Sequence, residues 1–283
     1  MIILITGCRG QLGNEIQKLA HNMPDDFQFI FTDKEELDIT NRNAVYDFVE
    51  RNKVSVIVNC AAYTAVDKAE TDSELCELLN HVAPTYLAEA IDSVGGSIIQ
   101  ISTDYVFDGQ NYKPYYEDDL TNPQSVYGRT KLAGEEGVIR SCVGAMVIRT
   151  AWLYSTFGNN FVKTMIRLGK ERSELGVIAD QIGTPTYARD LADVIMTILK
   201  QGITPGIFHY SNEGATSWYD FTKVIHRIAG ITDCKVKPIH TEDYPVAATR
   251  PHYSVFDKTK IKNTYNIEIP WWEDSLKNCI KEL

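Results

Sequence analysis

The 283-residue sequence lacks the features that mark membrane, secreted and nucleic-acid-binding proteins. Its 28 lysine and arginine residues are outnumbered by 38 aspartate and glutamate residues. The net charge of −10 argues against nucleic acid or an anionic membrane as the main partner, because both attract a basic face. No apolar run approaches the roughly 18 residues of a membrane span, and Met1 leads directly into apolar residues without a charged leader. We therefore expect a cytoplasmic protein.

The sequence also lacks the cysteine spacing of disulfide frameworks and metal sites. Its six cysteines lie far apart with no Cys-x-x-Cys pair, and its histidines show no ligand spacing. We expect reduced, mostly buried thiols and no metal. Internal repeats and low-complexity tracts are absent as well. What remains is a globular composition, 44% hydrophobic and 23% charged, in a chain long enough for one large domain or two smaller ones.

A glycine-rich turn follows the first apolar run. Residues 2–6 are continuously apolar up to a final threonine, which is typical of a parallel strand buried on both faces. Gly7, Gly10 and Gly13 follow, and a helix is expected to begin there and run to about Ala20. Such glycines allow a tight turn and a close approach to a pyrophosphate at the helix N-terminus. The spacing differs from the common G-x-G-x-x-G. The prediction of a dinucleotide site therefore rests on the position of the glycines between a strand and a helix.

An acidic residue stands where the adenosine ribose of a dinucleotide would be bound. Asp33 ends the second expected strand, residues 27–32, and lies 20 positions after Gly13. The alternative is an exposed turn aspartate. Asp33 favours NAD, whereas Arg9 and Lys34 could neutralise a 2′-phosphate. We therefore expect both NADH and NADPH to be used, with a slight preference for NADPH.

The segment that organises the rest of the chain begins at Asn122. Within it Tyr127 precedes Lys131 by four residues, so both side chains leave one face of a helix that starts after Pro123. The ammonium and the helix N-terminus are expected to lower the phenol pKa from about 10, which would make Tyr127 a proton donor. The alternative is a half-buried aromatic beside a solvated lysine. Upstream, the strand expected over residues 97–103 would bring Thr103 to the carboxyl edge of the sheet, where such sheets bind ligands.

Strands and helices alternate through the first half. This order predicts an α/β fold with a doubly wound parallel (Rossmann) sheet and a smaller, discontinuous α/β substrate domain. The dinucleotide-binding domain is expected over residues 1–150 and about 177–205. The substrate-binding domain is expected over about 151–176 and 206–283.

Several ordered motifs resemble the extended short-chain dehydrogenase/reductase family, and within it the dTDP-4-dehydrorhamnose reductases. The resemblance covers nearly the whole chain. It implies NAD(P)H-dependent reduction of the C4 ketone of dTDP-4-dehydro-L-rhamnose to dTDP-L-rhamnose, the last step of dTDP-rhamnose synthesis for cell-surface polysaccharide. The motifs are Gly7/Gly10/Gly13, residues 38–40, 60–67, 102–107, Tyr127-x-x-x-Lys131, residues 149–152, 159–165, 180–186 and Arg250-Pro251.

The resemblance also implies roles for single residues. Thr103, Tyr127 and Lys131 form the catalytic set, and Asn80 helps to hold the lysine through water. Substrate contacts fall on Thr103, Asp104 and Trp152. Coenzyme contacts fall on Gly10, Gln11, Leu12, Asp33, Asp38, Ile39, Ala62, Tyr63, Thr64, Tyr127 and Lys131, in addition to Gly7 and Gly13 of the turn.

The acidic chain needs local cations to meet a nucleotide-sugar diphosphate. Lys163 on an expected helix and Arg250 in a loop are candidates, with solvated surface charges as the alternative. The ring of Trp152 could stack on the sugar or fill a core.

Related functions remain open at this point. Dehydratases of this fold place Asp-Glu after the threonine, whereas Tyr105 follows Asp104 here, so reduction is the simpler interpretation. An epimerase that retains its coenzyme and a non-catalytic NADP-binding regulatory subunit of the methionine adenosyltransferase type are the alternatives. Some reductases of the family bridge subunits with Mg²⁺. Glu15 matches one such position, but Arg189 stands where another carboxylate is expected, which argues against a metal-bridged homodimer.

Overall fold

A six-stranded parallel sheet forms the centre of the larger lobe. The computed structural model describes residues 1–283. The strands lie in the order β10-β5-β4-β3-β1-β2, and all neighbouring pairs are parallel. Their bounds are β1 Ile2–Thr6, β2 Gln28–Thr32, β3 Val56–Asn59, β4 Ser97–Thr103, β5 Ala145–Thr150 and β10 Gly206–His209.

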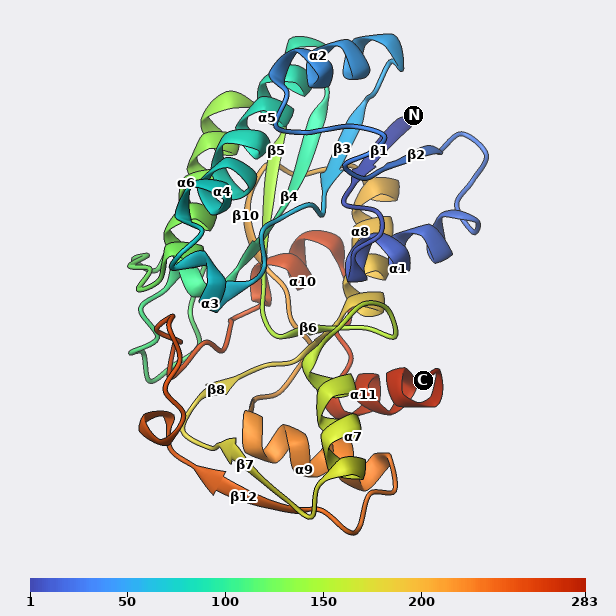
Figure 1. Cartoon of the computed structure of the whole chain (residues 1–283). Coiled ribbons are helices and arrows are strands. Elements are labelled where there is room, and N and C mark those ends of the chain that lie inside the picture. The colour runs from blue at the N-terminus through green and yellow to red at the C-terminus, as the bar shows by residue number, and fades with distance from the viewer.

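Helices cover both faces of this sheet, as the doubly wound prediction requires (Figure 1). One face carries α2 (Arg42–Arg51), α5 (Ala83–Ser93) and α6 (Val126–Ser141), which bury a cluster that includes Leu4 and Ile57. The other face carries α1 (Gln11–Ala20), α8 (Ala188–Gln201) and α10 (Thr259–Tyr265), packed on Ile3 and Ile5. Successive β1 side chains therefore belong to different cores. This explains why the strand is apolar throughout.

The strand order reverses direction at β1, which pairs with β2 on one side and β3 on the other. In open α/β sheets, ligands bind at the carboxyl ends of the strands at such a switch point. The turn at Gly7 and the segment Cys60–Ala62 follow β1 and β3 at this edge. The last residues of β4 and β5, Thr103 and Thr150, are paired with each other next to it.

A smaller lobe continues below the sheet edge (Figure 1). Its core packs apolar residues of several helices and short strands around Phe221 and Trp272. The elements are β6 Leu153–Tyr154, α7 Phe161–Glu171, β7 Glu174–Ile178, β8 Ile182–Gly183, β9 Thr186–Tyr187, β11 Thr216–Ser217, α9 Trp218–Ile228, β12 Lys235–Ile239, the 3₁₀ turn Thr241–Asp243 and α11 Trp272–Lys281. The lobe has no large sheet, because these strands pair only in twos: β11 with β8, β12 with β7 and β6 with β9.

The helical segment over residues 73–93 is not one continuous α-helix. It consists of α4 (Ser73–Glu77), a π-helical turn (Leu78–Val82) and α5, and a short α3 (Val66–Ala69) precedes it. A π-turn inserts an extra residue into the helix and often accompanies a functional site. Here it contains the buried Asn80. A further 3₁₀ turn, Asp104–Val106, continues β4.

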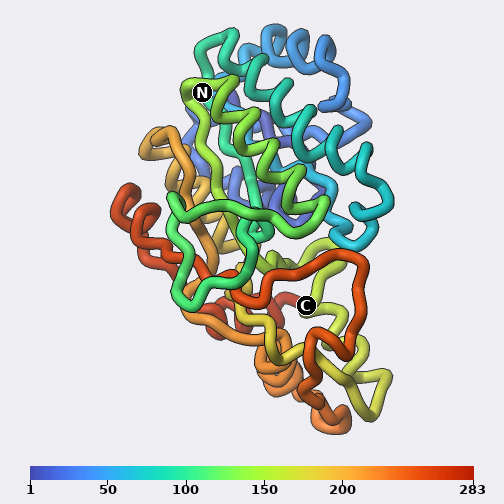
Figure 2. The backbone as a smooth tube through the Cα atoms, turned by 90° about the vertical axis from the view of Figure 1, so that its left-hand side faces the viewer, coloured from blue at the N-terminus to red at the C-terminus, as the bar shows by residue number.

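The chain returns to the larger lobe after building part of the smaller one. Figure 2 shows yellow and orange segments beside blue and green ones in the larger lobe, and these are α8 and β10. Strand β10 begins just after the predicted boundary at about residue 205 and pairs with β5, and α10 packs on the same lobe. A division that follows the sheet would therefore fall after His209, and the domain limits stay a prediction.

No helix is both long and apolar enough to span a bilayer. All six cysteines are unpaired thiols.

Candidate active site

The glycine-rich turn brings backbone against backbone. Gly7 has φ +62°, and a Cβ there would lie 2.7 Å from the backbone N of Ala61. A Cβ on Gly13 would lie 2.5 Å from the carbonyl oxygen of Gly7. Helix α1 begins after Gly10, which provides no side-chain cap, so the first amides of the helix have no capping partner. Free amides at a helix N-terminus attract anions.

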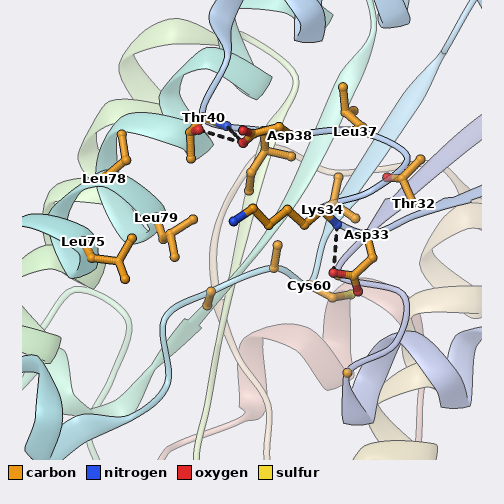
Figure 3. Close-up of a pocket in the computed structure, with 16 residues that line it drawn as sticks. Thr32, Asp33, Lys34, Leu37, Asp38, Thr40, Cys60, Leu75, Leu78 and Leu79 are labelled. Atoms are coloured by element: carbon orange, nitrogen blue, oxygen red, sulfur yellow. Dashed lines mark hydrogen bonds between the residues drawn. The ribbon is translucent and has the colours of Figure 1, made fainter. Parts of the chain in front are cut away.

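A cavity of about 510 Å³ opens beside this turn (Figure 3). The Asp33 carboxylate accepts hydrogen bonds from the backbone N–H groups of Arg9 (3.1 Å) and Lys34 (2.9 Å). Asp38 accepts from the backbone N–H (3.0 Å) and hydroxyl (2.6 Å) of Thr40. The lining includes the predicted Gly7, Gly10, Asp33, Asp38, Ile39 and Ala62, together with Leu75, Leu78 and Leu79, which we did not predict. These leucines come from α4 and the π-turn, where their helical spacing indicated only a packed face.

The two cations predicted near Asp33 differ in their surroundings. The Lys34 side chain extends across the cavity (Figure 3), and no carboxylate pairs with it. The Arg9 guanidinium instead pairs with Glu35 and with Glu36, the latter at 2.6 Å. Of the two, only Lys34 lines the cavity.

A second cavity of about 530 Å³ adjoins the first and contains the predicted catalytic residues; we call it the catalytic cleft. Gly10, Cys60, Ala61 and Ala62 line both cavities. Of the predicted residues, the catalytic cleft is lined by Gly10, Gln11, Leu12, Gly13, Ala62, Thr64, Thr103, Asp104, Tyr127, Lys131 and Trp152. Tyr63 lines neither cavity.

Helix α6 presents Tyr127 and Lys131 to the catalytic cleft. Ser125 caps the helix by accepting the Gly128 N–H at 3.1 Å, and Pro123 precedes it as expected. Gly128 must be small, because a Cβ there would lie 2.3 Å from the Tyr105 carbonyl oxygen. Tyr127 and Lys131 are 9% and 3% exposed. The predicted common face is thus the buried face of the helix.

The expectation that Tyr127 has a lowered pKa is wrong for the protein without ligand. Burial raises the pKa of the phenol above its usual value, and hydrogen bonding with Thr103 opposes this only in part. Lys131 is not among the groups that shift the pKa of Tyr127, and burial lowers the pKa of Lys131 itself to about 8. Its amine donates to the carbonyl of Ile101 at 2.6 Å and is therefore not free to bind a ligand hydroxyl in this structure.

Thr103 and Asp104 form a hydrogen-bonded pair at the end of β4. The Thr103 hydroxyl donates to Asp104 Oδ1 at 3.0 Å. Asp104 is 1% exposed, and its Oδ2 makes no hydrogen bond, although the Ser254 hydroxyl lies near the carboxyl and favours its charged form. Burial raises the pKa of this carboxyl to about 6. A buried, partly satisfied acid in a cleft is a group that a ligand hydroxyl can complete.

Trp152 lies just beyond β5 with φ +48°, a strained conformation for a bulky residue. Its ring stacks on Trp218 with a centroid separation of 3.4 Å and an interplanar angle of 9°. Both tryptophans line the catalytic cleft. Trp218 begins α9, and we did not predict it, because nothing in the sequence links it to a residue 66 positions earlier.

The remaining predicted residues lie outside the catalytic cleft. The Lys163 amine donates to the carbonyls of Thr156 and Gly158, each at 2.9 Å. Arg250 forms a two-pronged ion pair with Asp67 at 2.9 and 2.7 Å. Neither lines the cleft in this structure. Their predicted contact with a diphosphate requires these partners to be exchanged.

Asn80 supports the loop beside the catalytic cleft. Its Oδ1 accepts the Tyr63 N–H at 2.8 Å, and its Nδ2 donates to the Tyr63 carbonyl at 3.1 Å and the Thr130 hydroxyl at 3.3 Å. These contacts explain why Tyr63 is held behind the cleft rather than in it. Asn80 and α6 are in close contact, since a Cβ on Gly134 would lie 2.0 Å from the Asn80 carbonyl oxygen.

Glu15, which matches a metal-binding position in the resemblance, is fully buried in α1. It accepts a hydrogen bond from Ser155 at 2.5 Å. No group of three or more histidine, cysteine, aspartate and glutamate side chains is arranged to hold a metal ion.

The sheet topology is that of the extended short-chain dehydrogenase/reductases. More narrowly, the chain belongs to the family described as the RmlD substrate binding domain, whose model matches residues 1–283. It is 41% identical to a dTDP-4-dehydrorhamnose reductase of Aggregatibacter actinomycetemcomitans, over 98% of this chain and 97% of that protein.

Two solved structures resemble the whole chain. A dTDP-4-dehydrorhamnose reductase of Clostridium acetobutylicum has 47% identity and a TM-score of 0.95, over 100% of this chain and 99% of that one. The corresponding protein of Bacillus anthracis, solved in complex with NADP, has 40% identity and a TM-score of 0.94 with the same coverage. The fold prediction is therefore confirmed.

Proposed function

We propose that this protein reduces the C4 ketone of dTDP-4-dehydro-L-rhamnose to dTDP-L-rhamnose with NADPH or NADH, the last step of dTDP-rhamnose synthesis. The observation that carries the proposal is the placement of Thr103, Tyr127 and Lys131 in one cleft that adjoins the cavity at Asp33. Full-length relatives named dTDP-4-dehydrorhamnose reductase support the substrate.

The residues present fit a nicotinamide coenzyme. A Cβ at Gly7 or Gly13 would fill the tight turn, and the uncapped amides of α1 face the expected pyrophosphate position. Asp33 and Asp38 would bind the adenosine ribose, and Lys34 would meet a 2′-phosphate. The NADP complex of the Bacillus anthracis relative supports this assignment. When bound, the coenzyme supplies the hydride for reduction.

Tyr127 is the proposed proton donor to the ketone oxygen. Burial keeps its phenol protonated in the ligand-free protein, so the proton is present when substrate arrives. Thr103 would hydrogen-bond the same oxygen and stabilise the negative charge that grows on it in the transition state. Lys131 would leave the Ile101 carbonyl to hold the nicotinamide ribose, and its positive charge beside Tyr127 would then favour loss of the phenol proton.

The remaining cleft residues would hold the sugar. The free Oδ2 of Asp104 is suited to accept a sugar hydroxyl, and the Trp152 ring to contact an apolar sugar face. Lys163 and Arg250 remain proposed diphosphate ligands from the smaller lobe, which we propose as the substrate-binding domain. The nucleotide sugar is the proposed partner. Six unpaired thiols support a site of action in the cytoplasm, where thiols stay reduced. A homodimer without a bridging metal ion is the proposed assembly.

The test is an assay of the purified protein with dTDP-4-keto-6-deoxy-L-mannose and each reduced coenzyme. We expect oxidation of NADPH or NADH with equimolar formation of dTDP-L-rhamnose. Coenzyme binding without turnover would contradict the proposal and favour the regulatory-subunit alternative. Interconversion of sugars without net consumption of coenzyme would favour the epimerase.

A further inference from the structure

A buried ion pair lies one helical turn beyond Lys131. Glu135 and Arg149 are 1% and 2% exposed. Arg149 Nε donates to the two carboxylate oxygens of Glu135 at 3.0 and 3.1 Å, and its Nη2 donates to Oε2 at 2.7 Å. Nη1 donates to the Glu117 carbonyl at 3.3 Å. This pair is part of neither cavity lining.

The pair connects β5 with β4 and α6, the two elements that hold the proposed catalytic residues. Glu135 lies on α6, eight positions after Tyr127 and four after Lys131. It also accepts a hydrogen bond from Ser102 of β4, the residue before Thr103. Arg149 lies on β5 and pairs with Ser102 in the sheet register. One carboxylate therefore connects the helix with the two strands whose ends line the cleft.

Three consecutive residues of β4 contact side chains of α6. Residues 101, 102 and 103 of the strand meet side chains of the helix that lie one turn apart. The Ile101 carbonyl accepts from Lys131, the Ser102 hydroxyl donates to Glu135, and the Thr103 hydroxyl faces Tyr127. Of the three contacts, only that of Glu135 is unchanged in the proposed reaction, because Lys131 and Thr103 would bind ligands there.

Glu135 also supplies charge. Lys131 is surrounded by Cys76 of α4, Cys60 after β3 and Glu135 of its own helix, and only Glu135 is a carboxylate. Burial disfavours the ammonium form of Lys131, and Glu135 acts in the opposite direction. A buried ion pair is often no more stabilising than apolar residues of the same volume, so its presence here calls for a further role.

We propose that Glu135 is a positioning residue, which holds α6 in register with β4 and β5 and keeps the Lys131 amine an ammonium ion while the reaction runs. The inference rests on the proposed function, since Lys131 acts in that reaction. Ser102 and Arg149 are its partners, because they orient the carboxylate.

The main test is the pH dependence of kcat/KM for Glu135→Gln. This variant removes the negative charge and leaves the Arg149 cation, so the pKa of Lys131 falls further. We expect the alkaline limb of the profile to move to lower pH by about one unit, the scale for loss of one nearby opposite charge. Activity should recover toward the wild-type value as the pH is lowered. Glu136→Gln is the matched control, because Glu136 is exposed on the same helix and should leave the limb in place.

A double variant is included because Glu135→Gln alone leaves Arg149 buried without its partner and could fail to fold. Glu135→Gln/Arg149→Gln leaves no unpaired buried charge, and the limb should still move down, by less. Ser102→Ala retains both charges and loses one orienting hydrogen bond. We expect it to lower kcat severalfold while the limb stays in place. Circular dichroism and NADPH binding identify the variants that are folded.

Direct titration of Lys131 separates this inference from the proposed function. In ligand-free protein with ¹³C-labelled lysine, the NMR titration midpoint of Lys131 should fall in Glu135→Gln and not in Glu136→Gln. A folded Glu135→Gln protein with unchanged midpoint and unchanged alkaline limb would overturn the inference. A shifted midpoint in a protein that does not reduce the keto sugar would instead leave the charge effect standing and refute the proposed function.

Discussion

The two adjoining cavities are built in different ways. The cavity at Asp33 is lined by residues between positions 6 and 79, whereas the catalytic cleft takes residues from position 10 to position 218. The first presents the uncapped amides of α1 and turn carboxylates that are hydrogen-bonded within their own loops. The second buries an acid, a phenol and an amine together.

The difference shows in the pKa values of the two sites. In the first cavity, hydrogen bonds from Thr40 lower the pKa of the exposed Asp38. In the catalytic cleft, burial disfavours the charged forms of three side chains. It raises the pKa of Asp104 and of Tyr127, and it lowers the pKa of Lys131. The polar groups of the Asp33 cavity are stabilised without a ligand. In the catalytic cleft, buried ionisable groups lack full hydrogen bonding, and a ligand can supply it.

The largest effect is expected for a variant that should lower kcat and leave coenzyme binding nearly unchanged. Tyr127→Phe should lower kcat about a hundredfold or more, because the general acid is lost. The Kd for NADPH, measured by fluorescence titration, should change less than about twofold, since the Asp33 cavity is untouched and each tenfold change requires about 1.4 kcal/mol. Tyr112→Phe is the control, because Tyr112 is 90% exposed. Near-normal turnover in Tyr127→Phe would refute its role.

The carboxylates of Asp104 and Asp38 should change the free energy of unfolding with pH in opposite directions. The folded-state pKa of Asp104 is raised to about 6, so the folded protein loses stability as pH rises from about 4 to above 6. Asp104→Asn should therefore be more stable than wild type at pH 8, by about 2 to 3 kcal/mol, with the difference vanishing near pH 4. Urea unfolding at both pH values measures this.

Asp38→Asn should behave in the opposite way. Its folded-state pKa is lowered, so Asp38 contributes stability above its unfolded pKa and loses it as pH falls through the folded value. The variant should be less stable than wild type at pH 8 and equal at low pH. If both variants were more stable than wild type at pH 8, or both less stable, the two cavities would not differ in how they treat a carboxylate.

A methyl group in the glycine turn should damage both folding and coenzyme binding. Gly13→Ala directs Cβ at the Gly7 and Cys8 backbones, at 2.5 and 2.6 Å. Such overpacking costs about 1 to 3 kcal/mol, and Tm should fall by several degrees. NADPH affinity should also fall. Gly95→Ala is the comparison, since Gly95 has φ +73° with open space around it, and only Tm should respond there.

The smallest expected effect concerns coenzyme choice. Lys34→Ala should raise KM for NADPH severalfold and leave KM for NADH unchanged, because an exposed ion pair contributes about 1 kcal/mol or less. Arg9→Ala should change both values little, since Arg9 is already paired with Glu35 and Glu36. A larger effect from Arg9 would mean that this pair opens when coenzyme binds.

Residues that could be predicted from the sequence depend on local spacing, and those that were missed depend on tertiary packing. The turn at Gly7, Asp33, and the pair Tyr127 and Lys131 depend on local spacing, and the structure brings them to the expected sheet edge. The contact between Trp152 and Trp218 depends on how the smaller lobe packs, which no local pattern records. Burial of Tyr127 follows from packing as well, and for that reason the sign of its pKa shift was predicted incorrectly. The π-turn at Asn80 was missed because its helical residues show no break in pattern.

The late return of the chain to the large sheet limits how the protein can be divided. A fragment that ended at residue 150 would lack α8 and β10, and it would expose to water the sheet face that Leu191, Ile195 and Phe208 cover. Strand β5 would lose its partner β10 and become an exposed edge of the sheet. Such a fragment should aggregate rather than bind nucleotide, so the glycine turn works only when a segment synthesised much later has joined the same core.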